Sequence, residues 1–293
     1  RDSSIMTRGI EGVQDATDFT GKTIKLGADI LLNDTDNFAY WGKEVRAIPW
    51  LSIGPTYNKT FNGTFDGQGH TISGLYQLHE NVDGLTNFSG IQQGLFGFLG
   101  TEAKVNNVNI TSSAILRTAE GSGSSSYGYV GLLAGESHGS IDNCHVEGKV
   151  EVLDGCDVGG LIGNNRGLVA NSSSAGSVIT HEHWLSMSVG GLIGYNELSN
   201  ETDTLRNCNS SAAVEGFCNL GGLIGYSKQG VLLDCYATGN VKDNGHAGYN
   251  IGGLAGQACN LVSCHAEGNV TAANSNHVGG LVGKATNLKS CYA

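Results

Sequence analysis

One short motif in the sequence has the spacing of a serine nucleophile. Residues 135–139 read Gly-Glu-Ser-His-Gly, which matches the G-x-S-x-G elbow of serine hydrolases, with Ser137 at the nucleophile position. That elbow needs a sharp turn from a strand into a helix, and no helical pattern follows residue 139. Both glycines also recur at equivalent places in a repeat described below. We therefore predict that Ser137 is a structural residue and that this motif carries no catalysis.

Histidines at two places have part of the spacing of a zinc site. His181 and His183 would face the same side of an extended strand, where a third ligand could complete the site. No such ligand is visible, so a polar insertion loop is the simpler interpretation. His79-Glu80 begins like the H-E-x-x-H motif, but Asp83 takes the place of the second histidine. Acidic residues are densest before the repeats, without the spacing of a calcium loop: Asp29, Asp34, Asp36 and Asp66. No metal ion or other cofactor is predicted.

Several aromatic residues lie outside the repeated segments, although aromatic residues make up only 7% of the chain. Exposed aromatic rings commonly contact glycans and proteins. The candidate ligand contacts are therefore Trp41, Trp50, Trp184 and Tyr127. The alternative, which the sequence slightly favours for Trp41 and Trp50, is that these side chains fill irregular coils near the N-terminus.

A repeated unit must position all of these residues. Six segments share an apolar-Gly-x-Leu-x-Gly core, beginning at Val130, Val158, Val189, Leu220, Ile251 and Val278, and residues 94–97 form a degenerate seventh copy. The closing glycines, at 97, 135, 163, 194, 225, 256 and 283, are separated by 38, 28, 31, 31, 31 and 27 residues. A glycine beside an inward leucine implies either a positive φ or close approach of the next copy, and the sequence leaves both open.

A second element follows each core and forms columns when the copies are stacked. One column contains five thiols, in the order Val108, Cys144, Ser172, Cys208, Cys235, Cys264 and Cys291. An apolar column lies three positions earlier, and this odd offset predicts a bend between the two columns. The residues between them are small and polar, so they suit a bend and could hydrogen-bond along the stack: Asn107, Asn143, Asn171, Asn207, Asp234, Ser263 and Ser290. We predict that the five cysteines form an inward ladder of free thiols.

A unit of about 27–31 residues holds about three strands of ~5 residues with their turns, which is one coil of a β-helix. No segment shows a capped 3.6-residue stripe, which argues against a helical solenoid. The sequence therefore predicts an all-β, right-handed parallel β-helix. We assign residues 1–90 to an N-terminal cap and irregular first coils, with a short capping helix near Gly9 to Phe19. Residues 91–293 form the repeats, continuous with the cap and truncated at the C-terminal end.

Composition narrows the classes of partner. The formal net charge of −11 and the absence of a basic stripe argue against nucleic acid. No run of 18 apolar residues exists, so no membrane insertion is predicted. Glycine accounts for 46 of 293 residues and proline for two, which indicates many tight turns around a core and excludes a collagen-like chain.

The repeat resembles a known family. Its Gly-Gly-Leu-Ile-Gly core, followed by Asn-Cys-x-Ala-x-Gly-x-Val or close variants, is similar to the GLUG motif, and residues 19–30 and 63–72 resemble the segment that precedes such repeats. The resemblance covers about residues 19–293. It implies a bacterial surface protein, because these repeats occur in adhesin-like proteins and in non-catalytic regions of immunoglobulin A-specific metalloproteases. The zinc-protease motif is absent, so no protease activity is implied.

We therefore expect a secreted or cell-surface module that is not an enzyme and is part of a larger polypeptide. It would serve as an adhesin-like stalk whose loops contact a host or cell-surface glycan or protein. The alternative is a carbohydrate-active enzyme, either a glycoside hydrolase or a polysaccharide lyase, on the same scaffold. Two or three carboxylates within ~10 Å on one outer sheet would favour the enzyme, and dispersed carboxylates would favour the module.

Overall fold

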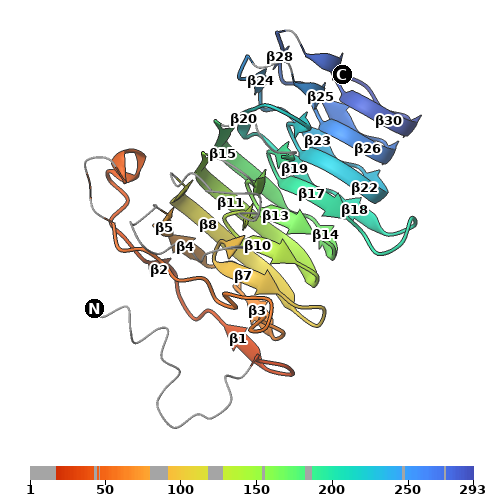
Figure 1. The fold of residues 1–293 in the computed structure, drawn as a ribbon. Coiled ribbons are helices and arrows are strands. Elements are labelled where there is room, and N and C mark those ends of the chain that lie inside the picture. Colours follow the sequence, from red (N-terminus) through yellow and green to blue (C-terminus); the bar gives the residue numbers. More distant parts are fainter. Residues whose placement is uncertain are drawn as a thin grey trace.

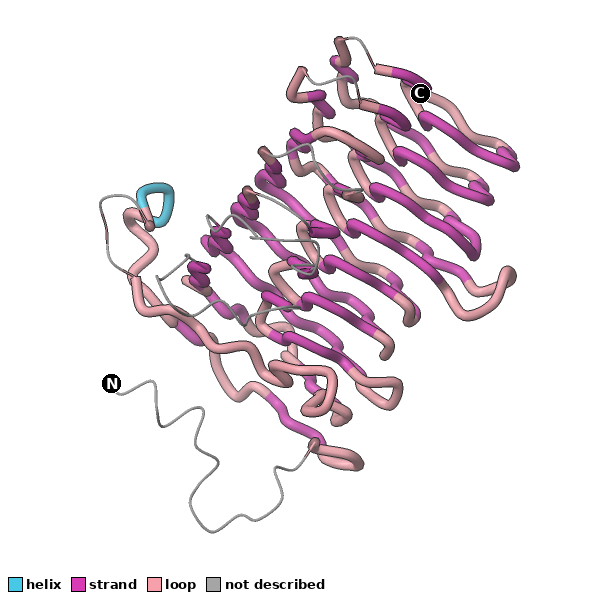
Figure 2. Tube along the Cα trace, viewed as in Figure 1, coloured by secondary structure: helices cyan, strands magenta, loops and turns pink. Residues whose placement is uncertain are grey.

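The computed structural model describes residues 18–42, 45, 47–79, 92–117, 128–153, 156–181, 187–245, 248–273 and 275–293. They form a parallel β-helix in which each coil lies against the next (Figures 1 and 2). The predicted all-β solenoid is confirmed. Within the described residues the only helical element is the 3-10 turn η1 (Phe38–Tyr40). The sequence predicts a capping helix near Gly9 to Phe19. Most of that segment lies outside the described residues, which begin at residue 18.

Each coil passes through two parallel sheets. The seven-stranded sheet contains β6 (Gln92–Gln93), β9 (Gly128–Val130), β12 (Cys156–Gly159), β16 (Val189–Gly190), β21 (Leu220–Gly221), β25 (Tyr249–Gly252) and β29 (Asn276–Gly279). A glycine arc, which is the turn made by the Gly-x-Leu segment of each repeat, leads from this sheet into the large sheet. The strands after the arcs are β7 (Phe96–Leu99), β10 (Ala134–Ser137), β13 (Ile162–Asn165), β17 (Ile193–Glu197), β22 (Ile224–Leu233), β26 (Ala255–Val262) and β30 (Val282–Lys289).

The remaining strands of the large sheet complete the coils and the N-terminal region. In the repeats they are β8 (Lys104–Arg117), β11 (Ser140–Val152), β14 (Leu168–Ala170), β15 (Ser173–Thr180), β18 (Thr204–Arg206), β19 (Asn209–Ser210), β20 (Ala213–Gly216), β23 (Tyr236–Ala237), β24 (Val241–Asp243), β27 (His265–Ala266) and β28 (Val270–Thr271). The N-terminal strands are β1 (Thr23–Lys25), β2 (Ile30–Leu31), β3 (Thr64–Asp66), β4 (Thr71–Ser73) and β5 (Tyr76–His79).

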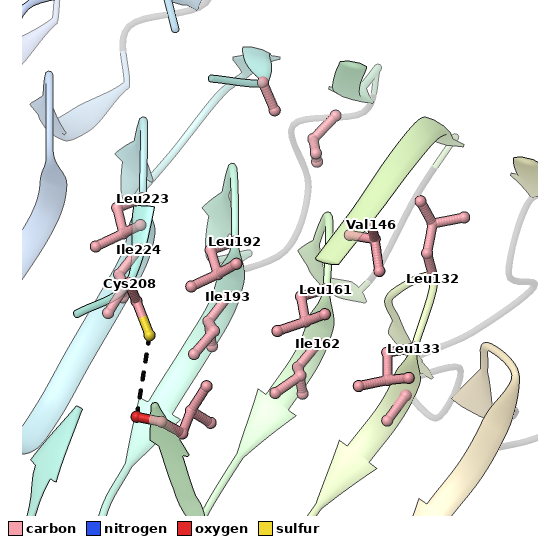
Figure 3. Close-up of a cluster of buried hydrophobic side chains, with 14 of the residues drawn as sticks. Leu132, Leu133, Val146, Leu161, Ile162, Leu192, Ile193, Cys208, Leu223 and Ile224 are labelled. Atoms are coloured by element: carbon pink, nitrogen blue, oxygen red, sulfur yellow. Dashed lines mark hydrogen bonds between the residues drawn. The ribbon is translucent and has the colours of Figure 1, made fainter. Parts of the chain in front are cut away.

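Successive repeats stack in register, which builds a single core of side-chain columns. Ile162 of β13 pairs with Ile193 of β17, and Ile193 pairs with Ile224 of β22. Figure 3 shows the resulting rows, in which equivalent leucines and isoleucines of neighbouring coils point the same way. The core leucines Leu133, Leu161, Leu192, Leu223 and Leu254 are fully buried. The repeat predicts the same burial for Leu281, but this leucine is only partly buried because no further described coil covers it.

The predicted bend is confirmed at every position of the polar column. Its seven residues all have left-handed backbone conformations, with φ between 50° and 55°. Asparagine and aspartate tolerate this region better than other non-glycine residues. The amide side chains also bond from coil to coil, as Asn143 Nδ2 donates to Asn107 Oδ1 at 2.8 Å and Asn207 Nδ2 donates to Asn171 Oδ1 at 3.1 Å.

Close packing of backbones explains the glycines of the arcs. None of the arc glycines has a positive φ. A Cβ atom added to Gly191 would lie 2.0 Å from the carbonyl oxygen of Gly222, and one added to Gly225 would lie 2.4 Å from the nitrogen of Val189. The second explanation left open by the sequence, close approach of the neighbouring coil, is therefore the correct one.

Candidate functional site

The richest collection of chemical groups lies beside the glycine arcs, on what we call the polar face. It consists of three columns of side chains that alternate along the strands with buried positions. The first column contains the residues that precede the arc cores: Tyr129, Asp157, Ser188, Asn219, Asn250 and His277. The second column contains the residues that follow the closing glycines: Glu136, Asn164, Tyr195, Tyr226, Gln257 and Lys284. The third column lies two residues further along the chain and contains His138, Arg166, Glu197, Lys228 and Cys259. In the middle of the stack the side chains of Arg166 and Lys228 are 44% and 51% exposed, which places the third column on the outside.

Asp157 is the most perturbed group of the polar face. Its Oδ1 accepts a hydrogen bond from the backbone nitrogen of Ser188 at 3.1 Å. Burial raises the pKa of the Asp157 carboxyl to about 7, and hydrogen bonds from Ser188 and the Asn164 side chain oppose this rise only partly. A carboxyl that keeps its proton near neutral pH is a common feature of acid–base sites, although structural carboxyls can be shifted in the same way.

A pair of tyrosines lies on the polar face, and one of them, Tyr195, interacts with Asp157. Tyr195 and Tyr226 occupy neighbouring coils, with ring centroids 5.4 Å apart and planes at 87°. Burial, together with the nearby Glu197, Tyr226 and Asp157, raises the pKa of Tyr195 to about 12. These electrostatic contacts place the Tyr195 hydroxyl near two carboxylates, Glu197 of its own coil and Asp157 of the preceding coil.

Basic side chains contact the other carboxylates of the polar face. Glu136, which is 8% exposed, lies 2.7 Å from His138 Nε2 through its Oε1 atom. Glu197 contacts Arg166 Nη1 at 3.2 Å and also Lys228. Glu136, Asp157 and Glu197 therefore stand on three successive coils, which is the kind of grouping expected of an enzyme, but two of them already have basic partners.

The structure places Ser137 inside the molecule. It is fully buried, and its register partners in the neighbouring coils are Leu99 and Asn165. Its Oγ has no hydrogen-bond partner among the described residues. Its neighbour His138 is directed to Glu136 instead. A buried hydroxyl without a base cannot attack a substrate in solvent, so the G-x-S-x-G motif is a product of the repeat.

The candidate metal ligands that the structure describes contact other partners. His181 Nε2 contacts Glu151 Oε1 at 2.9 Å, and His183 lies outside the described residues. Asp29 accepts a hydrogen bond from the backbone of Thr71, and Asp66 is held by Gln68 and Asn107. In the described part of the chain no group of three or more His, Cys, Asp or Glu side chains could hold a metal ion.

The five cysteines of the predicted ladder occupy equivalent, in-register positions. Cys144, Cys208, Cys235 and Cys264 are fully buried, Cys291 is partly buried, and all five are free thiols. Each thiol donates to the carbonyl oxygen two residues earlier, at 3.2 to 3.4 Å. Ser172 makes the same contact at 2.7 Å, which explains why a hydroxyl replaces a thiol in that coil.

We expect most of the eight cysteines to react with a thiol reagent after denaturation without reductant. In-register stacking aligns neighbouring Cβ vectors side by side, whereas a disulfide needs them turned toward each other. Burial raises the pKa of Cys144 to about 12, so this thiol should be unreactive in the native protein. Recovery of almost no thiol from the denatured protein would contradict the ladder of free cysteines.

The predicted aromatic contacts have different environments. Trp41 is 3% exposed and packs edge-on against Tyr76 at 5.4 Å, so it fills the N-terminal region. Trp50 is partly buried and donates from Nε1 to the carbonyl oxygen of Leu95 at 3.1 Å. Both tryptophans therefore fill the N-terminal coils, which is the alternative that the sequence favoured over ligand contact. Trp184 and Tyr127 lie outside the described residues.

Sequence reasoning missed two aromatic groups. One is the pair formed by Tyr195 and Tyr226. The other is a stack on the outer side of β23 and β27, in which His265 lies between Tyr236 and Tyr292 at centroid distances of 5.1 and 4.9 Å. Aligning the repeats would have placed each set in one column, because equivalent positions in successive coils must be neighbours.

Comparison with known proteins supports the repeat assignment. Residues 126–151 match the family model of the GLUG motif. The chain is 30% identical over 120 residues to halomucin of Haloquadratum walsbyi, which covers 40% of this chain and 1% of halomucin. It is 33% identical over 117 residues to a protein of Evansella cellulosilytica provisionally named a Gly-rich membrane protein, which covers 40% of this chain and 12% of that protein. The chain thus spans only a small part of the length of these relatives.

A crystal structure shares the fold. It is that of a provisionally assigned immunoglobulin A1 protease from Bacteroides ovatus, with a TM-score of 0.52 and 19% sequence identity over 93% of this chain and 68% of the other. Among the described residues, no helix is long and apolar enough to cross a membrane. In residues 126–151 the chain carries the GLUG motif, on a parallel β-helix whose other glycine arcs repeat the same geometry.

Proposed function

We propose that this chain is a non-catalytic, adhesin-like module of a secreted or cell-surface protein, and that its polar face binds glycans. The observation that carries the proposal is the pair of rings at Tyr195 and Tyr226, set among ion pairs and amides on a rigid stack. Aromatic rings flanked by hydrogen-bonding groups suit sugars, which have both apolar and hydroxyl-bearing faces. The names of the two relatives, a halomucin and a Gly-rich membrane protein, agree with a surface location.

The side chains with a catalytic appearance support the same proposal. Ser137 is buried, and Glu136 and Glu197 are held by basic groups. An inverting or retaining glycosidase needs two carboxyl groups free to act on the sugar. Among these three carboxylates of the polar face, Asp157 alone lacks a basic partner, and it accepts hydrogen bonds from Ser188 and Asn164.

An array of neutral and acidic glycans tests binding. We expect the native protein to bind a subset of them, and we expect Tyr195→Ala with Tyr226→Ala to weaken that binding by about fivefold or more, because aromatic anchors dominate contact energies. Tyr40→Ala is the matched control, since Tyr40 is 54% exposed and belongs to the 3-10 turn η1, which is not part of the polar face. Binding that survives the double substitution but is lost in the control would contradict the assignment of the surface.

A carbohydrate-active enzyme is the second candidate, favoured by the raised pKa of Asp157 beside Tyr195. The same glycans should be incubated with native protein and with Asp157→Asn. We expect no product from either protein. Turnover by the native protein that is abolished in Asp157→Asn would replace the module with an enzyme.

A further inference from the structure

An arginine and a lysine share one carboxylate on the polar face. Glu197 Oε2 contacts Arg166 Nη1 at 3.2 Å, and Glu197 Oε1 contacts Lys228 Nζ. The three residues belong to three successive coils, and we call them the basic cluster. With two cationic side chains and one carboxylate, the basic cluster has an excess of one positive charge.

The basic cluster presents unused hydrogen-bond donors to solvent. A guanidinium group has five N–H donors, an ammonium group has three, and neither has an acceptor. Both carboxylate oxygens of Glu197 already have a basic partner, and this side chain is only 20% exposed, whereas Arg166 and Lys228 are exposed. A ligand at this surface has to supply acceptors, and a carboxylate makes the stronger, charge-assisted hydrogen bonds.

A β-bulge lies at Lys228. The register of β17 and β22 shifts after the pair Asn196–Ser227, because the next pair is Glu197–Gln229, so Lys228 is an extra residue without a partner in β17. The pairing of β22 with β26 is irregular over the same residues. Bulges re-aim side chains and are frequent next to active sites. The strand therefore departs from the regular repeat at the residue that supplies the second positive charge.

The tyrosine pair adjoins the basic cluster. Besides its burial, which is the largest influence, the pKa of Tyr195 responds to Glu197, which raises it, and to Arg166, which lowers it. Tyr195 and Tyr226 are both half-buried, so part of each ring faces solvent. Asp157 also acts on Tyr195, but burial raises the pKa of Asp157 to about 7, so this carboxyl repels an anion less than an ordinary aspartate does at neutral pH.

We infer that the glycan bound by the polar face is acidic, and that Arg166 and Lys228 bind the carboxylate of a uronic or sialic acid beside the tyrosine pair. The inference rests on the proposed function and adds the class of sugar. The rings favour a sugar over an acidic peptide, because a pyranose has an apolar face that packs against an aromatic ring. The net charge of −11 has little influence here, since exposed charges more than ~8 Å away are largely screened at physiological ionic strength.

Matched acidic and neutral glycans test the inference. Oligosaccharides of galacturonic, glucuronic and sialic acid are compared with their methyl esters, which lack the charge, by calorimetric titration of the full chain. In about 0.1 M NaCl we expect at least one acid to bind about tenfold more tightly than its ester, which is what two exposed ion pairs supply together. The difference should shrink in about 1 M NaCl, where the Debye length falls from ~10 Å to ~3 Å.

Single substitutions identify the side chains. Arg166→Gln and Lys228→Gln should each weaken binding of that acid by about three- to fivefold, the upper range for one exposed ion pair, and should leave binding of the ester unchanged. Glu197→Gln should strengthen binding of the acid by about threefold, because it removes the carboxylate that competes with the ligand for both basic groups. Lys242→Gln and Glu215→Gln alter an exposed Lys–Glu pair that is not part of the polar face, so these matched controls should bind like the native protein.

Three outcomes would overturn the inference. They are esters that bind as tightly as their acids, an oligoglutamate peptide that binds as tightly as the acidic glycans, and a Glu197→Gln variant that binds the acid more weakly than the native protein does. If the protein binds neutral glycans and none of the acids, only this inference fails. If it binds no glycan, the proposed function fails as well. Far-ultraviolet circular dichroism establishes that each variant is folded.

Discussion

Replacing Leu223 by alanine is expected to lower the free energy of unfolding by about 2–5 kcal/mol, the usual cost of a large cavity in a packed core. Leu223 is fully buried and has equivalent leucines, Leu192 and Leu254, in the coils on both sides. Neither neighbour can fill the space without shifting its own coil, because the arc glycines hold adjacent backbones in contact. Equilibrium unfolding in urea, followed by circular dichroism, measures the loss.

Leu281→Ala is the matched control for that substitution. Leu281 holds the equivalent position in the last described coil and is only partly buried. We expect a smaller loss of stability, because less apolar surface returns to water and because an end coil can open locally without unfolding the rest. Equal losses for the two variants would show that stability is not transmitted from coil to coil.

Asp157→Asn is expected to stabilise the protein, by an amount that grows between pH 4 and pH 7. The pKa of this carboxyl is about 7 in the folded protein and 3.8 when unperturbed. Between these values the folded state keeps a proton that the unfolded state has released, so the stability of the native protein decreases as the pH rises. At 1.36 kcal/mol per pH unit, the loss is complete above pH 7 and amounts to about 4 kcal/mol. Asparagine cannot ionise and escapes this loss.

Urea unfolding of both proteins at pH 4.5 and pH 7.5 checks the prediction. The other titrating groups are common to both proteins, so their contributions cancel in the difference. The variant should exceed the native protein by little at pH 4.5 and by several kcal/mol at pH 7.5. A difference that is the same at both pH values would show that the carboxyl is ionised throughout.

The repeat made the fold predictable, because a periodic sequence constrains every coil at once. The odd offset between the cysteine column and the apolar column required a bend, and the seven residues between them all have positive φ. The role of the arc glycines was undecided, since a single sequence does not distinguish backbone conformation from backbone contact. That distinction depends on how far apart neighbouring coils lie.

The polar face was not predicted, for a physical reason. Asp157 and Asn164 are separated by a glycine arc, and their contact depends on how sharply that arc turns. A sequence motif groups residues that are adjacent in the chain, such as Ser137 and His138, but the alternation of the strand places these two on opposite sides. The division of the chain at residue 90 remains a prediction.

The stacking of the coils determines how much length the protein gains per residue. A repeat of 31 residues, such as the one between Gly194 and Gly225, advances the stack by one strand spacing of ~4.8 Å. That is about 0.15 Å per residue, against ~1.5 Å in an α-helix and ~3.3 Å in an extended chain. A protein that needed only distance from a surface would use far fewer residues. This architecture instead produces broad flanks on which equivalent positions recur at intervals close to the size of one sugar ring, so a ligand with a repeating backbone could meet the same type of contact several times.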